Sequence, residues 1–210
     1  MAMDLDAALI DELRHQHGVH TIILYGSRAR GDATAESDID VAGFADIPLT
    51  VRDARMWNGI FLDAFVYPTA RAAVPKDLAA EPEMMKLCAG RVLLDDRKLG
   101  ALLLDHLAAI DRQGPPALPA SELQVRRLWA RKMIARARRG DVEANYRRHW
   151  LLYQLLEDYF ALRGEWYRGP KDAFATLQVA APATFAAFER ALAPSATLDE
   201  IEALVTLVIG

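Results

Sequence analysis

Residues 24–41 read LYGSRARGDATAESDIDV, and this stretch decides the fold that we predict for the chain. The apolar run leading into it ends at Gly26 and Ser27, and after ten further residues Asp38 and Asp40 alternate with apolar residues. Side chains two positions apart on a strand point to the same face, so these two carboxylates are expected to lie together. Aspartate is a poor strand former, and neighbouring carboxylates repel each other. The pattern therefore predicts a cation site.

A third carboxylate stands in the segment GIFLDAFVYP, where Asp63 interrupts a strand that is otherwise almost entirely apolar. If this strand pairs beside the strand of Asp38 and Asp40, three carboxylates face one cleft. Hard oxygen ligands suit Mg²⁺, which also binds substrate phosphates. Two such ions, about 3.5–4 Å apart, activate an attacking oxygen and stabilise the leaving one. We therefore expect two Mg²⁺ ions, with these aspartates as ligands.

The residues between the apolar run and the aspartates have the chemistry of a phosphate site. Gly26 lets the backbone approach a phosphate closely, and Ser27 adds a hydroxyl at the expected start of a short helix, where free N–H groups favour an anion. Ser37 is a second candidate phosphate donor. Arg28 and Arg30 carry charge that neutralises phosphate, although a solvated turn position is the alternative, chiefly for Arg28.

The bulk composition is that of an ordinary globular protein of 210 residues with a formal net charge of −4. Its single cysteine, Cys88, excludes an internal disulfide and fits a reducing compartment. The acidic, amphipathic N-terminus is unlike a secretory signal, and no apolar run approaches the roughly 20 residues of a membrane-spanning helix. We therefore expect a cytoplasmic protein without membrane segments.

The hydrophobic pattern predicts an α+β chain in which a small α/β domain with a mixed sheet, residues 1–114, precedes an all-α helical bundle, residues 115–210. The segment GPPALP at 114–119 marks the boundary. Before it we expect strands at 19–25, 38–44, 60–67 and 91–94, helices at 4–17, 27–30 and 99–110, and a loop containing Pro48. After it we expect helices at 121–139 with Ser121 as cap, 142–163, 171–178, 183–192 and 198–208.

The segment GSRARGDATAESDID, followed by a lone aspartate in a later strand, resembles the nucleotidyltransferase superfamily that includes DNA polymerase β. Over residues 20–67 it is most similar to the bacterial branch with aminoglycoside nucleotidyltransferases and minimal nucleotidyltransferases. The resemblance implies that Asp38 and Asp40 bind metal and that Gly26 and Ser27 hold the triphosphate of an NTP. For Asp63 it implies either a metal ligand or the base for the acceptor hydroxyl, and the choice stays open.

A second resemblance lies in LRGEWYRGPKDAFATL, residues 162–177. The segment is similar to one in aminoglycoside adenylyltransferases, and this similarity implies that Lys171 reaches the nucleotide phosphates. The alternative is that Pro170 and Lys171 only begin a helix, since proline favours the first turn. Trp166 and Tyr167 are suited to stacking on a base or a sugar, and equally to a hydrophobic core.

Together these features predict an Mg²⁺-dependent nucleotidyltransferase, adenylyltransferase-like, that moves AMP from ATP onto a hydroxyl of a small polar acceptor. A cleft rich in carboxylates attracts a polycation, which suggests an aminoglycoside-like antibiotic and a role in resistance. A protein or tRNA acceptor is the enzyme alternative, and a nucleotide-binding regulator without turnover is the alternative of another class. The sequence does not identify the acceptor, the nucleobase or the oligomeric state.

A basic run at 126–148 is read either as an anion-receiving surface or as a solvated helix face.

Overall fold

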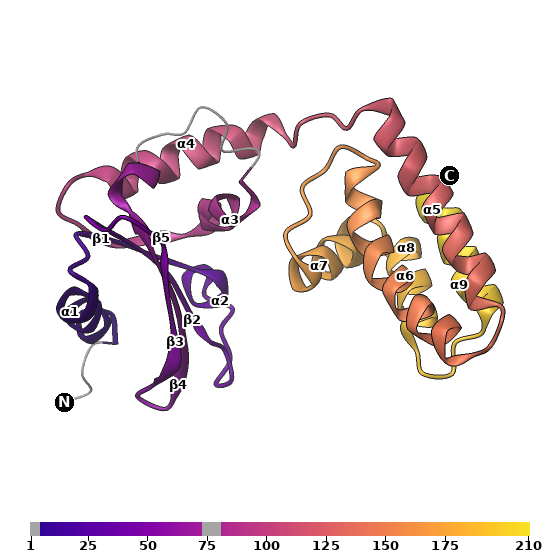
Figure 1. The fold of residues 1–210 in the computed structure, drawn as a ribbon, viewed down its shortest axis with the longest axis horizontal. Coiled ribbons are helices and arrows are strands. Elements are labelled where there is room, and N and C mark those ends of the chain that lie inside the picture. The colour runs from indigo at the N-terminus through magenta and orange to yellow at the C-terminus, as the bar shows by residue number, and fades with distance from the viewer. Residues whose placement is uncertain (1–4, 73–80) are drawn as a thin grey trace. The chain divides into compact units, whose positions relative to one another are not determined.

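The computed structural model describes residues 5–72 and 81–210. The chain divides into two compact units, Met1–Gln113 and Gly114–Gly210 (Figure 1). The first contains a sheet with helices and the second is helical, so the predicted α+β class is confirmed.

The described part of the N-terminal unit forms a five-stranded mixed sheet with the order β3-β4-β2-β1-β5. The strands β2 and β4 run parallel, and the other neighbouring pairs are antiparallel. The bounds are β1 Thr21–Tyr25, β2 Ile39–Ala45, β3 Val51–Trp57, β4 Ile60–Pro68 and β5 Arg91–Asp95. Four of these strands lie within a few residues of the expected positions.

The strand β3 corrects the sequence prediction, which placed its residues in the loop after Pro48. Its side chains are mostly exposed because it lies at the edge of the sheet, so it lacks the hydrophobic alternation of a half-buried strand. It joins β4 through Asn58 and Gly59, whose φ angles of 50° and 79° are those of the tight hairpin turn that Asn-Gly favours. The missed strand matters because it borders the strand that carries Asp63.

Helices lie on both sides of this sheet, with α1 (Leu5–His17) on one side and α2 (Gly26–Arg30) on the other (Figure 1). Leu9 and Leu13 of α1 are fully buried and belong to the same core cluster as Ile22 of β1 and Val41 of β2. On the other side α4 packs on β1, and Gly100 lies so close to Thr21 that a Cβ there would be 2.9 Å from its methyl group. The remaining elements are η1 Thr69–Arg71, α3 Pro82–Met85, η3 Lys86–Ala89 and α4 Leu99–Gln113.

A buried histidine fixes the start of β1. His20 is 7% exposed, and its two ring nitrogens lie 2.9 Å from the Thr21 hydroxyl and 2.8 Å from the Thr69 hydroxyl. Thr69 in turn donates to the carboxylate of Asp46 at 2.7 Å. Burial is the main cause that lowers the pKa of His20 below its ordinary value, so the ring is held neutral.

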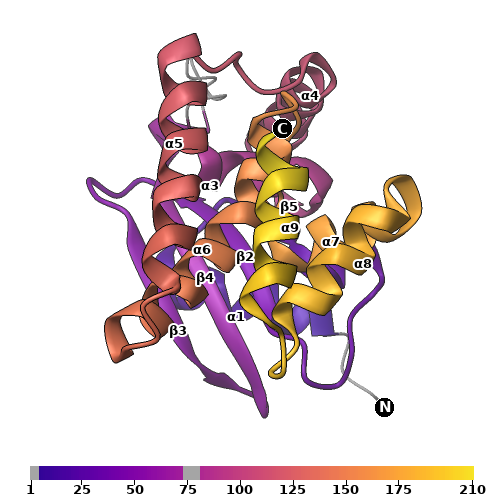
Figure 2. The same ribbon diagram turned by 90° about the vertical axis from the view of Figure 1, so that its right-hand side faces the viewer.

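The C-terminal unit is a bundle in which α5, α6 and α9 pack against one another (Figure 2). Its core is apolar and includes Leu155 and Phe160 of α6, Phe188 of α8 and Leu204 of α9. The bounds are α5 Ala120–Ala137, α6 Val142–Ala161, α7 Pro170–Ala180, α8 Pro182–Leu192 and α9 Leu198–Ile209.

Two helix starts of this unit, those of α6 and α9, have side-chain caps. Asp141 accepts a hydrogen bond from the amide of Ala144 at 2.7 Å, and Thr197 forms a capping box with Glu200. The prediction that Ser121 caps α5 is wrong, because the helix already begins at Ala120 and its cap position is taken by Pro119 without a side-chain hydrogen bond.

Part of the basic run is balanced by carboxylates of its own unit. Arg126 donates to the fully buried carboxylate of Asp158 at 2.7 Å. Arg139 and Arg147 both pair with Glu143. These ion pairs favour the interpretation of this run as a structural surface over that of an anion-receiving one.

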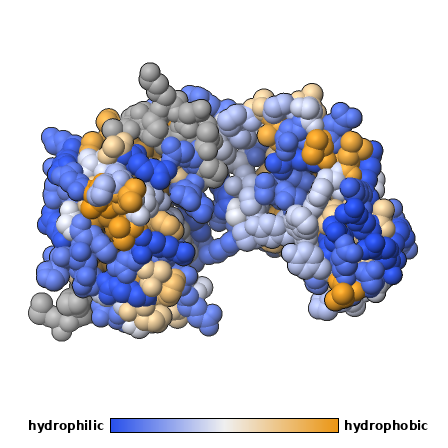
Figure 3. Space-filling model, in the orientation of Figure 1, coloured by the Kyte–Doolittle hydropathy of each residue, from blue (hydrophilic) through white to orange (hydrophobic). Residues whose placement is uncertain are grey.

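The face of the molecule in Figure 3 is mainly hydrophilic, and its hydrophobic residues form small separate groups. Within the described ranges, no helix combines the length and the apolar character that crossing a membrane requires.

Candidate active site

The register of the sheet brings two of the three predicted carboxylates together. In the parallel pair of β2 and β4, Asp40 is the direct partner of Asp63. Direct partners on neighbouring strands point to the same face of a sheet. Asp38 lies immediately before β2, two residues from Asp40, and is exposed.

The electrostatics of Asp40 reflect this crowding. Burial raises the pKa of the half-buried Asp40 carboxyl, and the negative charges of Asp38 and Asp63 raise it further. The positive charges of Arg30 and Lys86 act in the opposite direction but do not cancel the shift. Oxygen donors with excess negative charge are what a divalent cation requires, so the donor chemistry fits Mg²⁺.

The side chains are nevertheless not gathered around a single point. In the part of the chain that the structure describes, no group of three His, Cys, Asp or Glu residues is arranged to hold a metal ion. One reason is visible at Asp63, whose carboxylate is engaged by an arginine.

That arginine is Arg52 of the edge strand β3. Its Nε donates to Oδ1 of Asp63 at 2.8 Å and its Nη2 donates to Oδ2 at 2.9 Å, so both carboxylate oxygens are bound. The guanidinium also lies over the ring of Phe65, with its central carbon 5.1 Å from the ring centroid. The Asp63 side chain is 18% exposed whereas that of Arg52 is 57% exposed, so the arginine covers the carboxylate from the solvent side. Sequence reasoning missed Arg52 because it missed β3.

Gly26 lies against Asp40, and the contact explains why this position is glycine. Its φ of +70° is in the left-handed region, and a Cβ built on it would be 2.3 Å from Oδ2 of Asp40. The turn from β1 into α2 thus runs directly beside the carboxylate, which leaves room only for a backbone without a side chain. Ser27 follows as the second residue of α2, and its carbonyl accepts from the amides of Gly31 and Asp32 at 3.0 and 3.1 Å.

Arg28 has a structural contact that the sequence did not reveal. Its Nε donates to the carbonyl of Asp38 at 3.0 Å and its Nη2 to the carbonyl of Ser37 at 2.7 Å. Arg28 therefore ties α2 to the residues that lead into β2. The Ser37 hydroxyl accepts from the amide of Thr34 at 2.8 Å, so in this conformation it closes a local turn.

The remaining predicted phosphate contacts come from different parts of the chain. Arg30 lies close enough to Asp40 to affect its pKa and also approaches Asp32, with Nε 3.6 Å from its carboxylate. Lys86 of η3, which sequence reasoning did not single out, also acts on Asp40, because η3 packs against α2 and β1. Lys171 is the second residue of α7 and belongs to the C-terminal unit.

One comparison with known proteins matches part of the N-terminal unit. Residues 7–57 match the family described as Polymerase beta, Nucleotidyltransferase. This match over residues 7–57 supports the nucleotidyltransferase superfamily, and the resemblance drawn from residues 24–41 is confirmed. No curated protein is significantly similar to the chain. Among solved structures, a nucleotidyltransferase-like protein from Exiguobacterium sibiricum is 14% identical, with a TM-score of 0.45 over 97% of this chain and 71% of that one.

Proposed function

We propose that the chain transfers a nucleoside monophosphate, AMP from ATP, to a hydroxyl of a small polar acceptor and releases pyrophosphate. The observation that carries this proposal is the contact between Gly26 and Asp40, where a Cβ would be 2.3 Å from the carboxylate oxygen. The turn proposed to hold the triphosphate and the carboxylate proposed to hold the metal thus lie side by side. Asp63, the register partner of Asp40, adds the third carboxylate of the proposed site.

Asp38, Asp40 and Asp63 are the proposed ligands of two Mg²⁺ ions. When bound, these ions would neutralise phosphate charge and stabilise the attacking and leaving oxygens. The chain itself contributes the bare backbone of Gly26, the hydroxyl of Ser27, and positive charge near Asp40. Phosphoryl transfer depends mainly on such positioning and charge neutralisation.

In the proposed reaction the acceptor oxygen forms a bond to the α-phosphorus, and the bond from that phosphorus to the oxygen bridging the β-phosphate breaks. Pyrophosphate leaves with the electron pair of that bond, and the acceptor hydroxyl releases its proton. Asp63 is the proposed residue for either taking this proton or binding metal. Both of its oxygens accept hydrogen bonds from Arg52, so Arg52 has to move before Asp63 can serve either role freely.

The proposed acceptor class is polar and cationic, with aminoglycosides as the first compounds to test, because a carboxylate cluster attracts positive charge. The C-terminal unit is proposed to bind the acceptor and close over the nucleotide, with Lys171 reaching the phosphates. Ser37 and Arg30 are proposed to assist at the triphosphate, Ser37 after release of its bond to Thr34.

A transfer assay with two labels tests the proposal. ATP labelled at the α-phosphate and ATP labelled at the γ-phosphate are each incubated with the protein, Mg²⁺ and a panel of aminoglycosides, lincosamides, proteins and tRNA. We expect the α-label on an acceptor and the γ-label in pyrophosphate. The Asp38→Asn variant should lose transfer while remaining folded. Asp46→Asn, which removes the same charge just beyond the other end of β2, serves as the matched control and should retain transfer.

Three results would contradict the proposal. Transfer of the γ-label would indicate a phosphotransferase, and wild-type rates in the Asp38→Asn variant would refute the assigned site. Saturable ATP binding without pyrophosphate release across the whole panel would indicate a regulator rather than an enzyme.

A further inference from the structure

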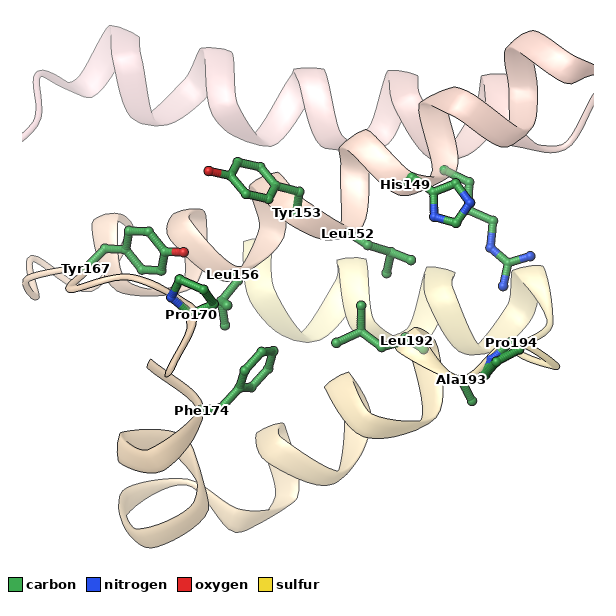
Figure 4. A pocket seen from close by; sticks show the side chains of 12 residues that line it. His149, Leu152, Tyr153, Leu156, Tyr167, Pro170, Phe174, Leu192, Ala193 and Pro194 are labelled. Atoms are coloured by element: carbon green, nitrogen blue, oxygen red, sulfur yellow. The ribbon is translucent and has the colours of Figure 1, made fainter. Parts of the chain in front are cut away.

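The helical unit contains a cavity of about 580 Å³ that the nucleotidyltransferase site does not explain. Its walls come from α6, from α7 and the segment leading into it, and from the end of α8 (Figure 4). This volume lies within the range of about 300–1,000 Å³ that is typical of small-molecule sites. All of its lining residues belong to Gly114–Gly210, so the cavity is complete within one unit.

The cavity has an apolar centre between two polar ends. Leu152, Leu156 and Phe174 occupy the middle, while Tyr153 and Tyr167 lie at one end (Figure 4). Burial raises the pKa of the Tyr167 phenol, so this hydroxyl remains protonated and able to donate at neutral pH. The apolar centre therefore favours a ligand with an apolar or aromatic body, and the Tyr167 hydroxyl can donate to it.

The other end is basic. His149 lies there beside Ala193 and Pro194 (Figure 4), and Arg148 also lines the cavity. No aspartate or glutamate is among the lining residues that the structure describes. An uncompensated guanidinium at the wall of an apolar cavity favours an anionic ligand group and disfavours a cationic one.

Arg148 is also short of hydrogen-bond acceptors. Its Nη2 donates to the carbonyl of Ala196 at 2.8 Å, but its Nε is buried and has no partner among the described residues. In the described part of the chain this guanidinium lines the cavity and forms no ion pair, so a ligand carboxylate would supply one. The adjacent Arg147 differs, because its guanidinium pairs with Glu143 and it does not line the cavity.

We propose that this cavity binds a small organic anion with an aromatic or aliphatic body, whose carboxylate-like group is held by Arg148. The ligand class is opposite in charge to the polycation that the carboxylates of the N-terminal unit attract. The inference does not depend on nucleotide transfer, since every residue it uses lies in the C-terminal unit.

Three naphthalene compounds of similar shape and different charge provide the test. Isothermal titration calorimetry with the whole chain, without nucleotide or metal, compares 1-naphthoate, 1-naphthylmethanol and 1-naphthylmethylamine. We expect saturable binding of the acid, binding of the alcohol weaker by about tenfold, and no binding of the amine, because charge-assisted hydrogen bonds are the stronger ones.

Two variants and one control locate the binding. Arg148→Met should weaken naphthoate binding at least tenfold and remove the preference for acid over alcohol, whereas Arg147→Met, which removes the same charge one residue away, should change neither. Leu192→Trp should abolish binding of all three compounds by filling the cavity. It provides a second test if Arg148→Met does not fold, because Leu192 is 47% exposed and tolerates a larger side chain.

The proposal is supported if two results are both obtained. The wild type must bind the acid more tightly than the alcohol and the amine, and Arg148→Met must lose this preference or Leu192→Trp must lose binding. The proposal is overturned if the amine binds as tightly as the acid, if none of the compounds binds saturably, or if the folded variants bind naphthoate as the wild type does. Because the assay contains no ATP, its failure leaves the nucleotide-transfer proposal untouched.

Discussion

Replacing Gly26 by alanine tests the central contact of the candidate site. The backbone of Gly26 has a φ of +70°, and an L-residue in this left-handed region costs about 1–2 kcal/mol. The new methyl group would also be 2.3 Å from Oδ2 of Asp40, which is far below van der Waals contact. Relieving such an overlap costs a further ~1–3 kcal/mol of folding free energy. We therefore expect Gly26→Ala to lower the free energy of unfolding by about 2–5 kcal/mol.

Gly31 provides a matched control for this variant. Its φ is +82°, also left-handed, but a Cβ at this position would meet nothing within 4 Å. Gly31→Ala should therefore lose only about 1–2 kcal/mol, the cost of the backbone conformation. The difference between the two variants isolates the contact with Asp40.

Urea unfolding followed by circular dichroism measures both stabilities, and calorimetric titration with Mn²⁺ measures the cation binding that we propose for the carboxylates. We expect Mn²⁺ binding and nucleotide transfer to fall strongly in Gly26→Ala, because the Asp40 carboxylate has to turn away from the methyl group. Both should be retained in Gly31→Ala. Equal stability and equal Mn²⁺ affinity in the two variants would refute the inferred contact.

Three further outcomes follow from single contacts. Arg52→Met should tighten Mn²⁺ binding by removing a competing cation, whereas Arg55→Met on the opposite face of β3 should not alter it; weaker binding in Arg52→Met would contradict this. His20 has a lowered pKa in the folded state, so stability should fall as the pH drops below the unfolded value of about 6.5, and His20→Gln should reduce that slope in urea titrations at pH 7.5 and 5.5. Arg126→Met should cost about 2–4 kcal/mol in thermal or urea unfolding by leaving the buried Asp158 carboxylate without its cation, and an unchanged midpoint would contradict it.

Much of the candidate site could be predicted from local sequence because its signals are local. Asp40 stands in a strand whose other residues are buried and apolar. A charged, poor strand former at this position is unusual, and this contrast marks it as a candidate site residue. Asp63 repeats this contrast in β4. The pairing of these two strands then follows from general rules, since a strand with buried residues on both faces belongs to the interior of a sheet.

The edge strand could not be predicted by the same reasoning. In β3 only Trp57 is buried, and charged residues occupy both faces. The strand forms because β4 offers an unpaired edge, which is a tertiary cause that hydrophobic periodicity does not record. One local signal is present in the sequence: the Asn58-Gly59 dipeptide stands before an apolar run and favours a hairpin, which predicts a strand on its other side.

The charges that tertiary packing brings close to Asp40 could not be predicted from the sequence either. Lys86 acts on Asp40 although 46 positions of sequence separate them, and no spacing rule connects a residue of η3 with one of β2. The roles of Arg28 and Ser37 were hidden for a different reason. Both residue types suit phosphate binding, but whether a side chain serves the backbone or a ligand depends on loop geometry, and here Arg28 donates to two carbonyls.

The pair of Arg52 and Asp63 bears on the question that the sequence left open for the third carboxylate. A carboxylate with both oxygens held by one guanidinium is neither a free base nor a free metal ligand. Breaking the ion pair between Arg52 and Asp63 nevertheless costs little free energy, because the Arg52 side chain is largely exposed and a solvated ion pair contributes little to stability. Arg52 is therefore suited to balancing the carboxylate cluster until a stronger cation replaces it. If the three aspartates bind metal as proposed, the affinity of that site depends on a residue of the edge strand as well.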